Sequence, residues 1–125
     1  MTTRQHITEA NLERREPAGG ECELLFWRYC RMFELPLPTS QYVAIPGRRF
    51  RFDFAWPAQR VLVEVQEETA HGKWRKQSQD AEKLNLAQLQ GYIVLQFTGT
   101  MLRDDPAGCI KTVTTALAMA SESNT

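Results

Sequence analysis

Apolar and polar residues alternate with a period of two in two neighbouring runs, 50–56 and 61–66, and this alternation is typical of β-strands. Four residues around Pro57 separate the runs, so the pattern predicts an antiparallel hairpin centred between Ala58 and Gln59. One predicted face is wholly apolar, with the pairs Phe52–Val65, Phe54–Val63 and Trp56–Val61. The other face is mostly polar, with the pairs Arg51–Gln66, Asp53–Glu64 and Ala55–Leu62.

The pair Asp53 and Glu64 is the chemically informative part of this hairpin. Directly opposed side chains have Cβ atoms about 4.5–5.5 Å apart, and like charges there destabilise a sheet. A protein that keeps two carboxylates at that spacing either protonates one of them or supplies a cation. Mg²⁺ is one such cation, bound by one or two carboxylates, water and phosphate oxygens. The alternative is an exposed polar face whose acids are neutralised by Arg51 and Arg60.

Apolar residues at helical spacing predict three helices around the hairpin. The first covers about 21–34, with apolar positions at Leu25, Phe26, Tyr29, Met32 and Phe33. The second runs from an N-cap at Ser78 to Gln90, with Gly91 as its C-terminal cap. Its inward positions are Ala81, Leu84, Ala87 and Leu89, and its Asp80 and Lys83 face elsewhere. The third begins at Asp105-Pro106, which are predicted to be its N-cap and first helical residue. Its inward-facing positions are Ile110, Val113, Leu117 and Ala120.

Two more strands complete the predicted sheet, at 41–45 and 92–97. The second of them is an unbroken apolar run, as expected of a strand buried on both faces. The order helix, three strands, helix, strand, helix predicts one α/β domain over 21–120, with a central mixed four-stranded sheet flanked by helices. The strand 61–66 and the strand 92–97 should be parallel and joined by a right-handed crossover.

The composition fits one globular domain of 125 residues, with a polar N-terminal arm over 1–20 and a flexible tail over 121–125. Lys plus Arg and Asp plus Glu both number 15, so only local clusters can favour nucleic acid. The odd number of cysteines, three, and the absence of a Cys-x-x-Cys motif disfavour a zinc site and predict buried, reduced thiols. No signal peptide or run of about 18 apolar residues is present, so we expect a soluble, cytoplasmic protein without a membrane partner.

Three further features are candidates for function. Arg48, Arg49 and Arg51 lie beside the carboxylate pair and could hold phosphates, although such runs are usually solvated surface. A second basic cluster comprises Lys73, Trp74, Arg75 and Lys76, and its tryptophan would stack on a base or ribose or else pack on the domain edge. Glu23 lies in the first turn of a helix, where an acid also simply stabilises the helix dipole.

In this order, Glu23, Asp53 and the Glu-x-Gln motif of Glu64 and Gln66 resemble the PD-(D/E)xK nucleases, which have the restriction-endonuclease-like fold. More narrowly, the chain is similar to small phage- and prophage-encoded nucleases of the Vsr-related group. The resembling stretches are 49–56, 63–66, 82–85 and 94–98, and with their connections they span roughly residues 21–118. The resemblance implies a metal-dependent DNA endonuclease that hydrolyses phosphodiester bonds with Mg²⁺ or Mn²⁺, in the cytoplasm of a bacterial host if phage-encoded.

Carried over to this chain, the resemblance implies that Asp53 and Glu64 ligate the metal and that Glu23 is a further ligand. Gln66 takes the position that usually holds a lysine, and its amide can orient water but cannot act as a base or cation. Lys83 on the next helix would supply the missing charge, or else is a surface partner of Asp80. Arg48, Arg49, Arg51 and the second basic cluster would hold DNA, and a homodimer would suit cleavage of both strands.

The chain also departs from these nucleases after the Glu-x-Gln motif. Relatives carry a glycine pair and a longer loop there, whereas this chain has Glu67-Glu68 and a shorter loop over 69–79. Two more carboxylates would repel DNA unless they point away or help to hold metal. The alternative function is therefore a catalytically inactive nuclease-like module that binds DNA or a protein partner.

Overall fold

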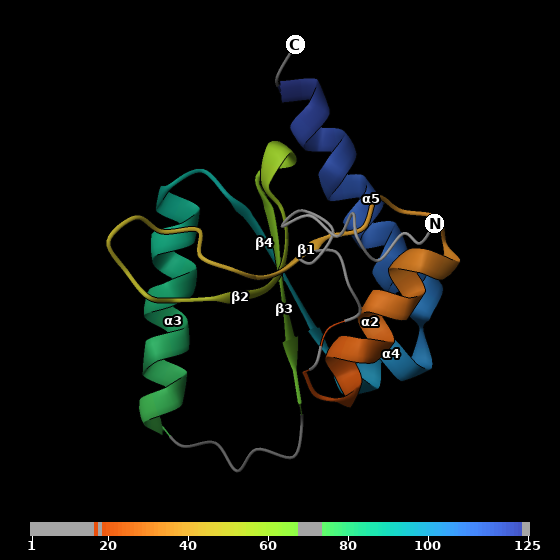
Figure 1. Ribbon diagram of the computed structural model, residues 1–125, viewed down its shortest axis with the longest axis horizontal. Coiled ribbons are helices and arrows are strands. Elements are labelled where there is room, and N and C mark those ends of the chain that lie inside the picture. Colours follow the sequence, from red (N-terminus) through yellow and green to blue (C-terminus); the bar gives the residue numbers. More distant parts are fainter. Residues whose placement is uncertain (1–16, 18, 68–73, 124–125) are drawn as a thin grey trace, which may run out of the picture.

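The computed structural model describes residues 17, 19–67 and 74–123, without the side chains of 74–79 and 122–123 (Figure 1). The predicted arm over 1–20 lies almost wholly outside the described residues. In chain order the elements are α2 (Glu21–Met32), β1 (Thr39–Tyr42), β2 (Phe52–Trp56), the 3₁₀ helix η2 (Pro57–Gln59), β3 (Val61–Gln66), α3 (Trp74–Leu89), β4 (Ile93–Thr98), α4 (Gly99–Asp104) and α5 (Pro106–Ser123).

The four strands form one mixed sheet in the order β1-β2-β3-β4. The pairs β1–β2 and β2–β3 are antiparallel, and β3–β4 is parallel, as predicted. Helix α3 covers one face of the sheet, and α2, α4 and α5 lie on the other (Figure 1). The predicted α/β class, with a mixed four-stranded sheet flanked by helices, is confirmed. Both faces of the last strand are covered, as predicted, since Ile93 and Leu95 pack against one core and Val94 against the other. Burial is nevertheless incomplete, because β4 is an edge strand and these three residues are only half-buried.

The hairpin of β2 and β3 has the predicted register, with Phe54 opposite Val63, Ala55 opposite Leu62 and Trp56 opposite Val61. Its connection is the 3₁₀ turn η2, which ends at Arg60 in the left-handed region (φ 58°). The alternation of apolar and polar residues is therefore sufficient to set the pairing of these strands, since a slip of one residue would turn every side chain to the opposite face.

The predicted apolar face does not extend to Phe52. This ring belongs to the cluster on the α3 side of the sheet, with Ala55 and Leu62, whereas Phe54 and Trp56 pack on the opposite side. The regular alternation breaks at the residue between the two phenylalanines, Asp53, whose side chain accepts a hydrogen bond from the backbone of β3. The paired register of β2 and β3 stops at Phe54–Val63, and Phe52 lies beyond it, in the other core.

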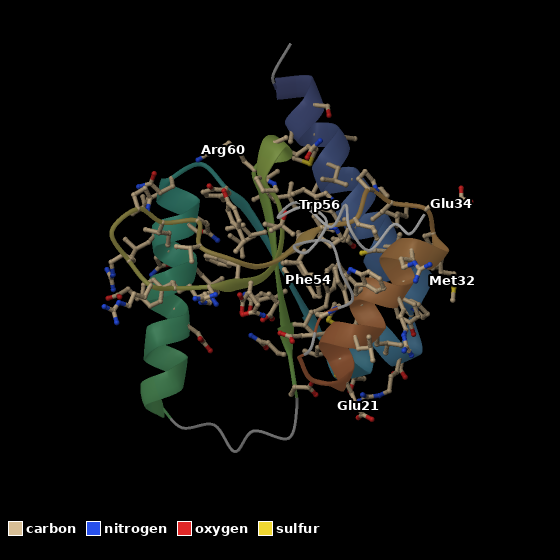
Figure 2. All side chains as sticks on the ribbon, in the orientation of Figure 1. Glu21, Met32, Glu34, Phe54, Trp56 and Arg60 are labelled. Carbon is tan, nitrogen blue, oxygen red and sulfur yellow. The ribbon has the colours of Figure 1, made fainter. Side chains whose placement is uncertain are left out.

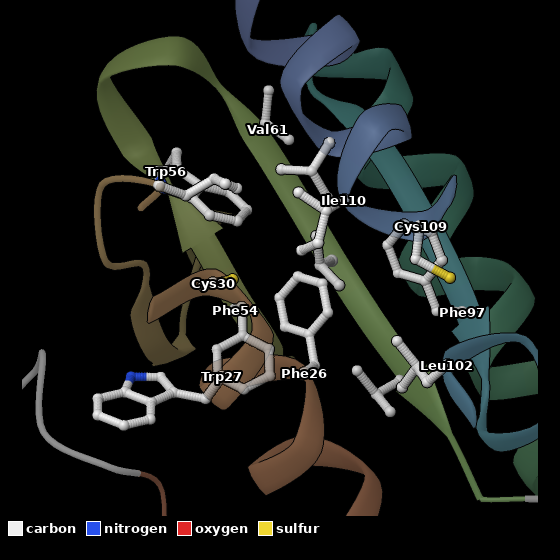
Figure 3. Close-up of a cluster of buried hydrophobic side chains, with 14 of the residues drawn as sticks. Phe26, Trp27, Cys30, Phe54, Trp56, Val61, Phe97, Leu102, Cys109 and Ile110 are labelled. Atoms are coloured by element: carbon white, nitrogen blue, oxygen red, sulfur yellow. The ribbon is translucent and has the colours of Figure 1, made fainter. Parts of the chain in front are cut away.

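Phe26 of α2 is the centre of the larger core (Figure 3). It is fully buried, and its ring centroid lies 5.0 Å from that of Phe54, 5.7 Å from Phe97 and 6.4 Å from Trp56. These contacts join α2 to β2 and β4. Leu102 of α4 and Ile110 of α5 close the same cluster (Figure 3).

The bounds of α2 agree with the prediction, but its exposed positions do not. Met32 and Phe33 are 69% and 41% exposed, and Met32 lies on the outer side of the helix (Figure 2). The side chains that α2 buries are Cys22, Phe26, Trp27 and Cys30. Helical spacing alone is compatible with either group of side chains facing inward, and contact with the sheet decides which group is buried.

Helix α3 begins at Trp74, so the predicted N-cap at Ser78 is wrong. The residues added at its start include Arg75, Lys76 and Gln77, which are good helix formers, and the connecting loop is correspondingly shorter. Leu89 is 83% exposed, against prediction, while Leu84, Leu86 and Ala87 contact the sheet. Ala81 is also exposed. Gly91 has the expected left-handed conformation after the helix (φ 88°).

The remaining elements differ from the sequence prediction mainly at their ends. Strand β1 starts at Thr39 because Thr39 and Ser40 pair with Ala55 and Phe54. Helix α4 was not predicted. Helix α5 begins as expected, with Asp105 Oδ1 accepting a hydrogen bond from Gly108 N–H at 3.0 Å, and continues to Ser123.

The three cysteines are buried and unpaired with one another, as predicted. Of the inward positions predicted for α5, Ile110, Val113 and Ala120 are buried, and Leu117 packs against the core. In the part of the chain that the structure describes, no helix combines the length and apolar character needed to cross a lipid bilayer.

Replacing Phe26 by Ala should lower the free energy of unfolding by about 3–5 kcal/mol, because the ring fills the centre of the larger core. Phe33→Ala, at the end of the same helix, removes a partly exposed ring and should cost about 0.5 kcal/mol. Urea unfolding of the two variants and the wild type measures both values. Equal losses in the two variants would contradict the assignment of Phe26 as the core residue of α2.

Candidate acidic site on the central hairpin

The carboxylates of Asp53 and Glu64 lie together, as the hairpin pattern predicts, and both bond to the backbone of the opposite strand. Asp53 N–H donates to Glu64 Oε1 at 3.2 Å, and Val65 N–H donates to Asp53 Oδ2 at 2.7 Å. The paired register of β2 and β3 runs from Trp56–Val61 to Phe54–Val63, next to these two residues. Side-chain carboxylates therefore serve as acceptors where the backbone ladder ends, and the hydrogen bonds fix their orientation.

Lys83 of α3 supplies a cation to this pair. Its Nζ lies 2.7 Å from Glu64 Oε1, and the side chains of Lys83 and Glu64 are only 12% and 18% exposed. The ammonium group also lies 4.6 Å from the ring centroid of Phe52. The expectation that Lys83 faces away from the sheet is wrong, since this ion pair draws its side chain inward.

Arg60 does not neutralise the acidic pair, contrary to the alternative interpretation of the sequence. Its guanidinium stacks 4.2 Å above the ring of Tyr92 and donates to the backbone carbonyl of Gln90. Arg51, the other residue considered for this role, is exposed. The ion pair of Glu64 is formed by a lysine from a different element, α3.

Glu23 extends from the first turn of α2 to the same site. Its side chain hydrogen-bonds to Asp53 and to the backbone of Gly20, and Gln41 Nε2 lies 3.5 Å from its Oε1. Burial, followed by the hydrogen bond to Asp53 and the charge of Asp53, raises the pKa of Glu23 to about 8. Glu23 is therefore more than a surface residue that stabilises the helix dipole.

Glu64 also holds its proton more tightly than an ordinary carboxyl group. Burial, and then the charge of Asp53, raises the pKa of Glu64 to about 7, although the ion pair with Lys83 acts in the opposite direction. Burial outweighs the lysine here because both partners are largely removed from water. Near neutral pH the site thus contains carboxyl groups that remain partly protonated unless more positive charge is added.

The carboxylates of Asp53 and Glu64 are the oxygen donors in this site that could hold a divalent metal. Mg²⁺ typically binds one or two carboxylates and completes its coordination with water and substrate oxygens. The hydrogen bonds described above engage Oδ2 of Asp53 and Oε1 of Glu64, so they hold the two groups side by side. Among the side chains that the structure describes, no group of three or more His, Cys, Asp or Glu is arranged to hold a metal ion. The arrangement fits a two-carboxylate site with Glu23 beside it, rather than a three-carboxylate cage.

Gln66, which the resemblance to PD-(D/E)xK nucleases places where those enzymes carry a lysine, is exposed and bonded to the neighbouring strand. Its Nε2 donates to Gln96 Oε1 of β4 at 2.6 Å. Gln66 lies two residues after Glu64 on β3, and Gln96, which holds its amide, is the residue that pairs with Glu64 in the parallel register. The sequence offered Gln66 and Lys83 as residues for this position, and the contact with Glu64 is made by Lys83.

Glu67 has a role that the sequence did not reveal. Its Oε1 accepts a hydrogen bond from Cys22 N–H and its Oε2 accepts one from the Cys22 thiol, both at 3.1 Å. The carboxylate therefore points to the start of α2, which is one of the arrangements that would avoid repelling DNA. The sequence does contain a hint of this role of Glu67. The N-cap, Gly20, has no side chain, so the free N–H groups at the start of α2 need an acceptor from another part of the chain.

The basic residues are only partly available for phosphate. Arg48 forms an ion pair with Glu82 of α3 and lies 4.6 Å above the ring of Phe50, whereas Arg49 and Arg51 are exposed. Lys73 lies outside the described residues. Trp74, Arg75 and Lys76 form the first turn of α3, and their side chains are outside the description.

Comparison with known proteins adds no relative: no protein-family model matches the sequence, and no curated protein or solved structure is similar enough to count as a match. The chemistry of the site therefore has to be inferred from its own residues. These are the acidic hairpin, the lysine from α3 and the glutamate from α2.

The raised pKa values of Glu23 and Glu64 predict that metal-free protein loses stability as the pH rises. The folded state keeps these protons from the ordinary pKa of 4.5 up to about 7 and 8, whereas the unfolded chain releases them earlier. Unfolding therefore releases protons in this window, and the free energy of unfolding falls between about pH 5 and pH 8.

Asp53→Asn should make this fall shallower, because Asp53 raises both pKa values, and asparagine can still accept the hydrogen bond from Val65. Urea unfolding in EDTA at several pH values, with carboxyl ¹³C NMR titration, measures the effect. Glu34→Gln, an exposed change at the far end of α2, should leave the slope unchanged. A slope for Asp53→Asn equal to that of the wild type would show that the carboxyl groups are not coupled.

Proposed function

We propose that this protein is a divalent-metal-dependent DNA endonuclease of the PD-(D/E)xK type. It would hydrolyse phosphodiester bonds of DNA with a metal ion held by Asp53 and Glu64. The observation that carries the proposal is that more carboxyl groups than basic groups meet at this site. Among the described residues, the carboxyl groups of Glu23, Asp53 and Glu64 interact with one another, and the ammonium group of Lys83 contacts one of them, Glu64. A structural ion pair needs only one acid for each base, so the arrangement is better suited to a bound cation of higher charge.

Asp53 and Glu64 would hold Mg²⁺ or Mn²⁺, with Glu23 next to them. When bound, such an ion offsets negative charge on the scissile phosphate and lowers the pKa of a water molecule. The protein's own contribution is orientation: the backbone N–H groups of Asp53 and Val65 hold the carboxylates in place before substrate arrives. A site arranged during folding needs little rearrangement during the reaction.

Lys83 takes the role that a strand lysine has in related nucleases. Gln66 carries no charge, and its amide is bonded to Gln96. Lys83 brings an ammonium group to Glu64 from α3, and this group also lies 4.6 Å from the ring centroid of Phe52. From there it orients the attacking water or a phosphate oxygen by hydrogen bonding.

DNA would be held by the arginines before β2 and by the start of α3. Arg49 and Arg51 are exposed, whereas Arg48 is already paired with Glu82 and contributes less. Lys73, Trp74, Arg75 and Lys76 are the further DNA-binding residues that the sequence suggests, and a homodimer would allow both strands to be cut. Such contacts to phosphates make binding dependent on salt and nearly independent of sequence.

The second candidate function is a nuclease-like module that binds DNA or a protein without cutting. The observation in its favour is Gln66, because an uncharged amide bonded to Gln96 occupies the usual lysine position. The two functions differ in turnover, not in binding, since metal and basic residues support both.

Cleavage of supercoiled plasmid, branched DNA and single strands in Mg²⁺, Mn²⁺ or EDTA tests the proposal. The wild type should cut at least one substrate with metal and none in EDTA. Asp53→Asn and Glu64→Gln should each abolish the activity, because each removes one of the two metal-binding carboxylates, and Glu34→Gln should retain it.

Cutting by Asp53→Asn or Glu64→Gln at the wild-type rate would refute the assigned site and indicate a contaminating nuclease. Absence of cutting by folded wild type with both metals and all three substrates would refute the endonuclease. Retention of metal-supported DNA binding in that case would favour the binding module.

Lys83→Met should lower kcat about 100-fold, in the range of a lost proton-transfer or orienting group. It should also shift the pH profile upward, since Lys83 lowers the pKa of Glu64. Lys83→Arg should retain part of the activity. Asp80→Asn, which removes the surface partner suggested by the sequence, should have no effect, and a loss as large as that of Lys83→Met would contradict the role given to Lys83.

A further inference from the structure

The first turn of α2 is capped by a residue far away in the sequence. Its N-cap, Gly20, has no side chain to accept hydrogen bonds from the free N–H groups at the start of the helix. Glu67, directly after β3, accepts hydrogen bonds from the N–H of Cys22 through Oε1 and from the thiol of Cys22 through Oε2. A carboxylate at a helix N-terminus is also favoured by the helix dipole.

This turn carries Glu23. The rest of the helix is held by Phe26, one turn further on, through its ring contacts with Phe54 and Phe97. Phe26 sets the position of the helix axis, but an uncapped first turn is prone to fray. What holds the turn at Cys22 is therefore one determinant of the placement of Glu23 beside Asp53, together with the hydrogen bond of Glu23 to the backbone of Gly20.

The two glycines before the helix leave room for these carboxylates. A Cβ atom on Gly20 would lie 2.8 Å from Glu67 Oε1, and one on Gly19 would overlap the carboxylate of Glu23. Larger residues would displace the side chains that connect α2 to the sheet. The space before α2 is thus occupied by one carboxylate that caps the helix and one that reaches the acidic site.

We propose that Glu67 is a positioning residue, which ties the first turn of α2 to the end of β3 and so holds Glu23 against Asp53. Glu64 and Glu67 belong to the same segment, so one stretch of chain carries a metal-binding carboxylate and the cap of the helix that supplies Glu23. The effect on metal binding and cleavage rests on the proposed function, whereas the position of Glu23 does not.

The test compares Glu67→Ala with Glu67→Gln, whose amide oxygen can still accept from Cys22 N–H. Glu21→Ala is the matched control, because it removes another acid from the same turn without touching Cys22. Three quantities are measured: hydrogen exchange of the Cys22 amide, the ¹³C resonance of the Glu23 carboxyl group, and the dissociation constant for Mn²⁺ by calorimetry.

Glu67→Ala should speed exchange of the Cys22 amide about tenfold, shift the Glu23 carboxyl resonance and weaken Mn²⁺ binding several-fold, as expected when a cap is lost. Glu67→Gln should restore most of each value, and Glu21→Ala should match the wild type. Should Glu67→Ala not fold, Glu67→Asp, which is one methylene shorter, answers the same question with the same expected changes.

Faster exchange at Cys22 with an unchanged Glu23 resonance would overturn the proposal, because Glu67 would then only stabilise the helix. An equal shift of that resonance in Glu21→Ala would also overturn it, since the cap would not be specific. If the wild type neither binds Mn²⁺ nor cuts DNA, the nuclease proposal fails, and the Glu23 resonance still decides whether Glu67 positions Glu23.

Discussion

The repulsion between Asp53 and Glu64 is the constraint on which the surrounding structure depends. Two carboxylates between paired strands, largely out of water, would destabilise the hairpin if nothing compensated for them. The compensation comes from three sources: backbone N–H groups of Asp53 and Val65, the ammonium group of Lys83, and retained protons on Glu23 and Glu64. Each source belongs to a different kind of interaction, and together they make the acidic site compatible with a stable sheet.

Each of the two hydrophobic cores positions one of the side chains that surround the acidic pair. On one side, Phe26 packs on Phe54 and Phe97, so that α2 is fixed over the sheet and brings Glu23 to the hairpin. On the other side, Phe52 packs with the α3 cluster and lies under the ammonium group of Lys83. The two phenylalanines flanking Asp53 thus point to opposite cores, and this arrangement makes room for the carboxylate between the strands.

Much of the fold could be predicted from local pattern. The hairpin register followed from period-two alternation, the start of α5 from Asp105-Pro106, and the end of α3 from Gly91. The errors lie where a tertiary contact competes with the pattern. Lys83 was placed outward because a charged residue usually is, but Glu64 draws it in. Leu89 was placed inward, but the helix turns Leu86 and Ala87 to the sheet and leaves Leu89 exposed.

The sequence by itself determined that Asp53 and Glu64 meet, because strand alternation and a four-residue connection leave one register that buries the apolar face. Only the tertiary structure decided which groups surround them. Lys83 and Glu23 reach the pair from helices that lie on opposite faces of the sheet, and Glu67 bonds to Cys22, which is 45 residues away. Such contacts depend on how helices pack against the sheet, and no periodicity within a single segment encodes that packing.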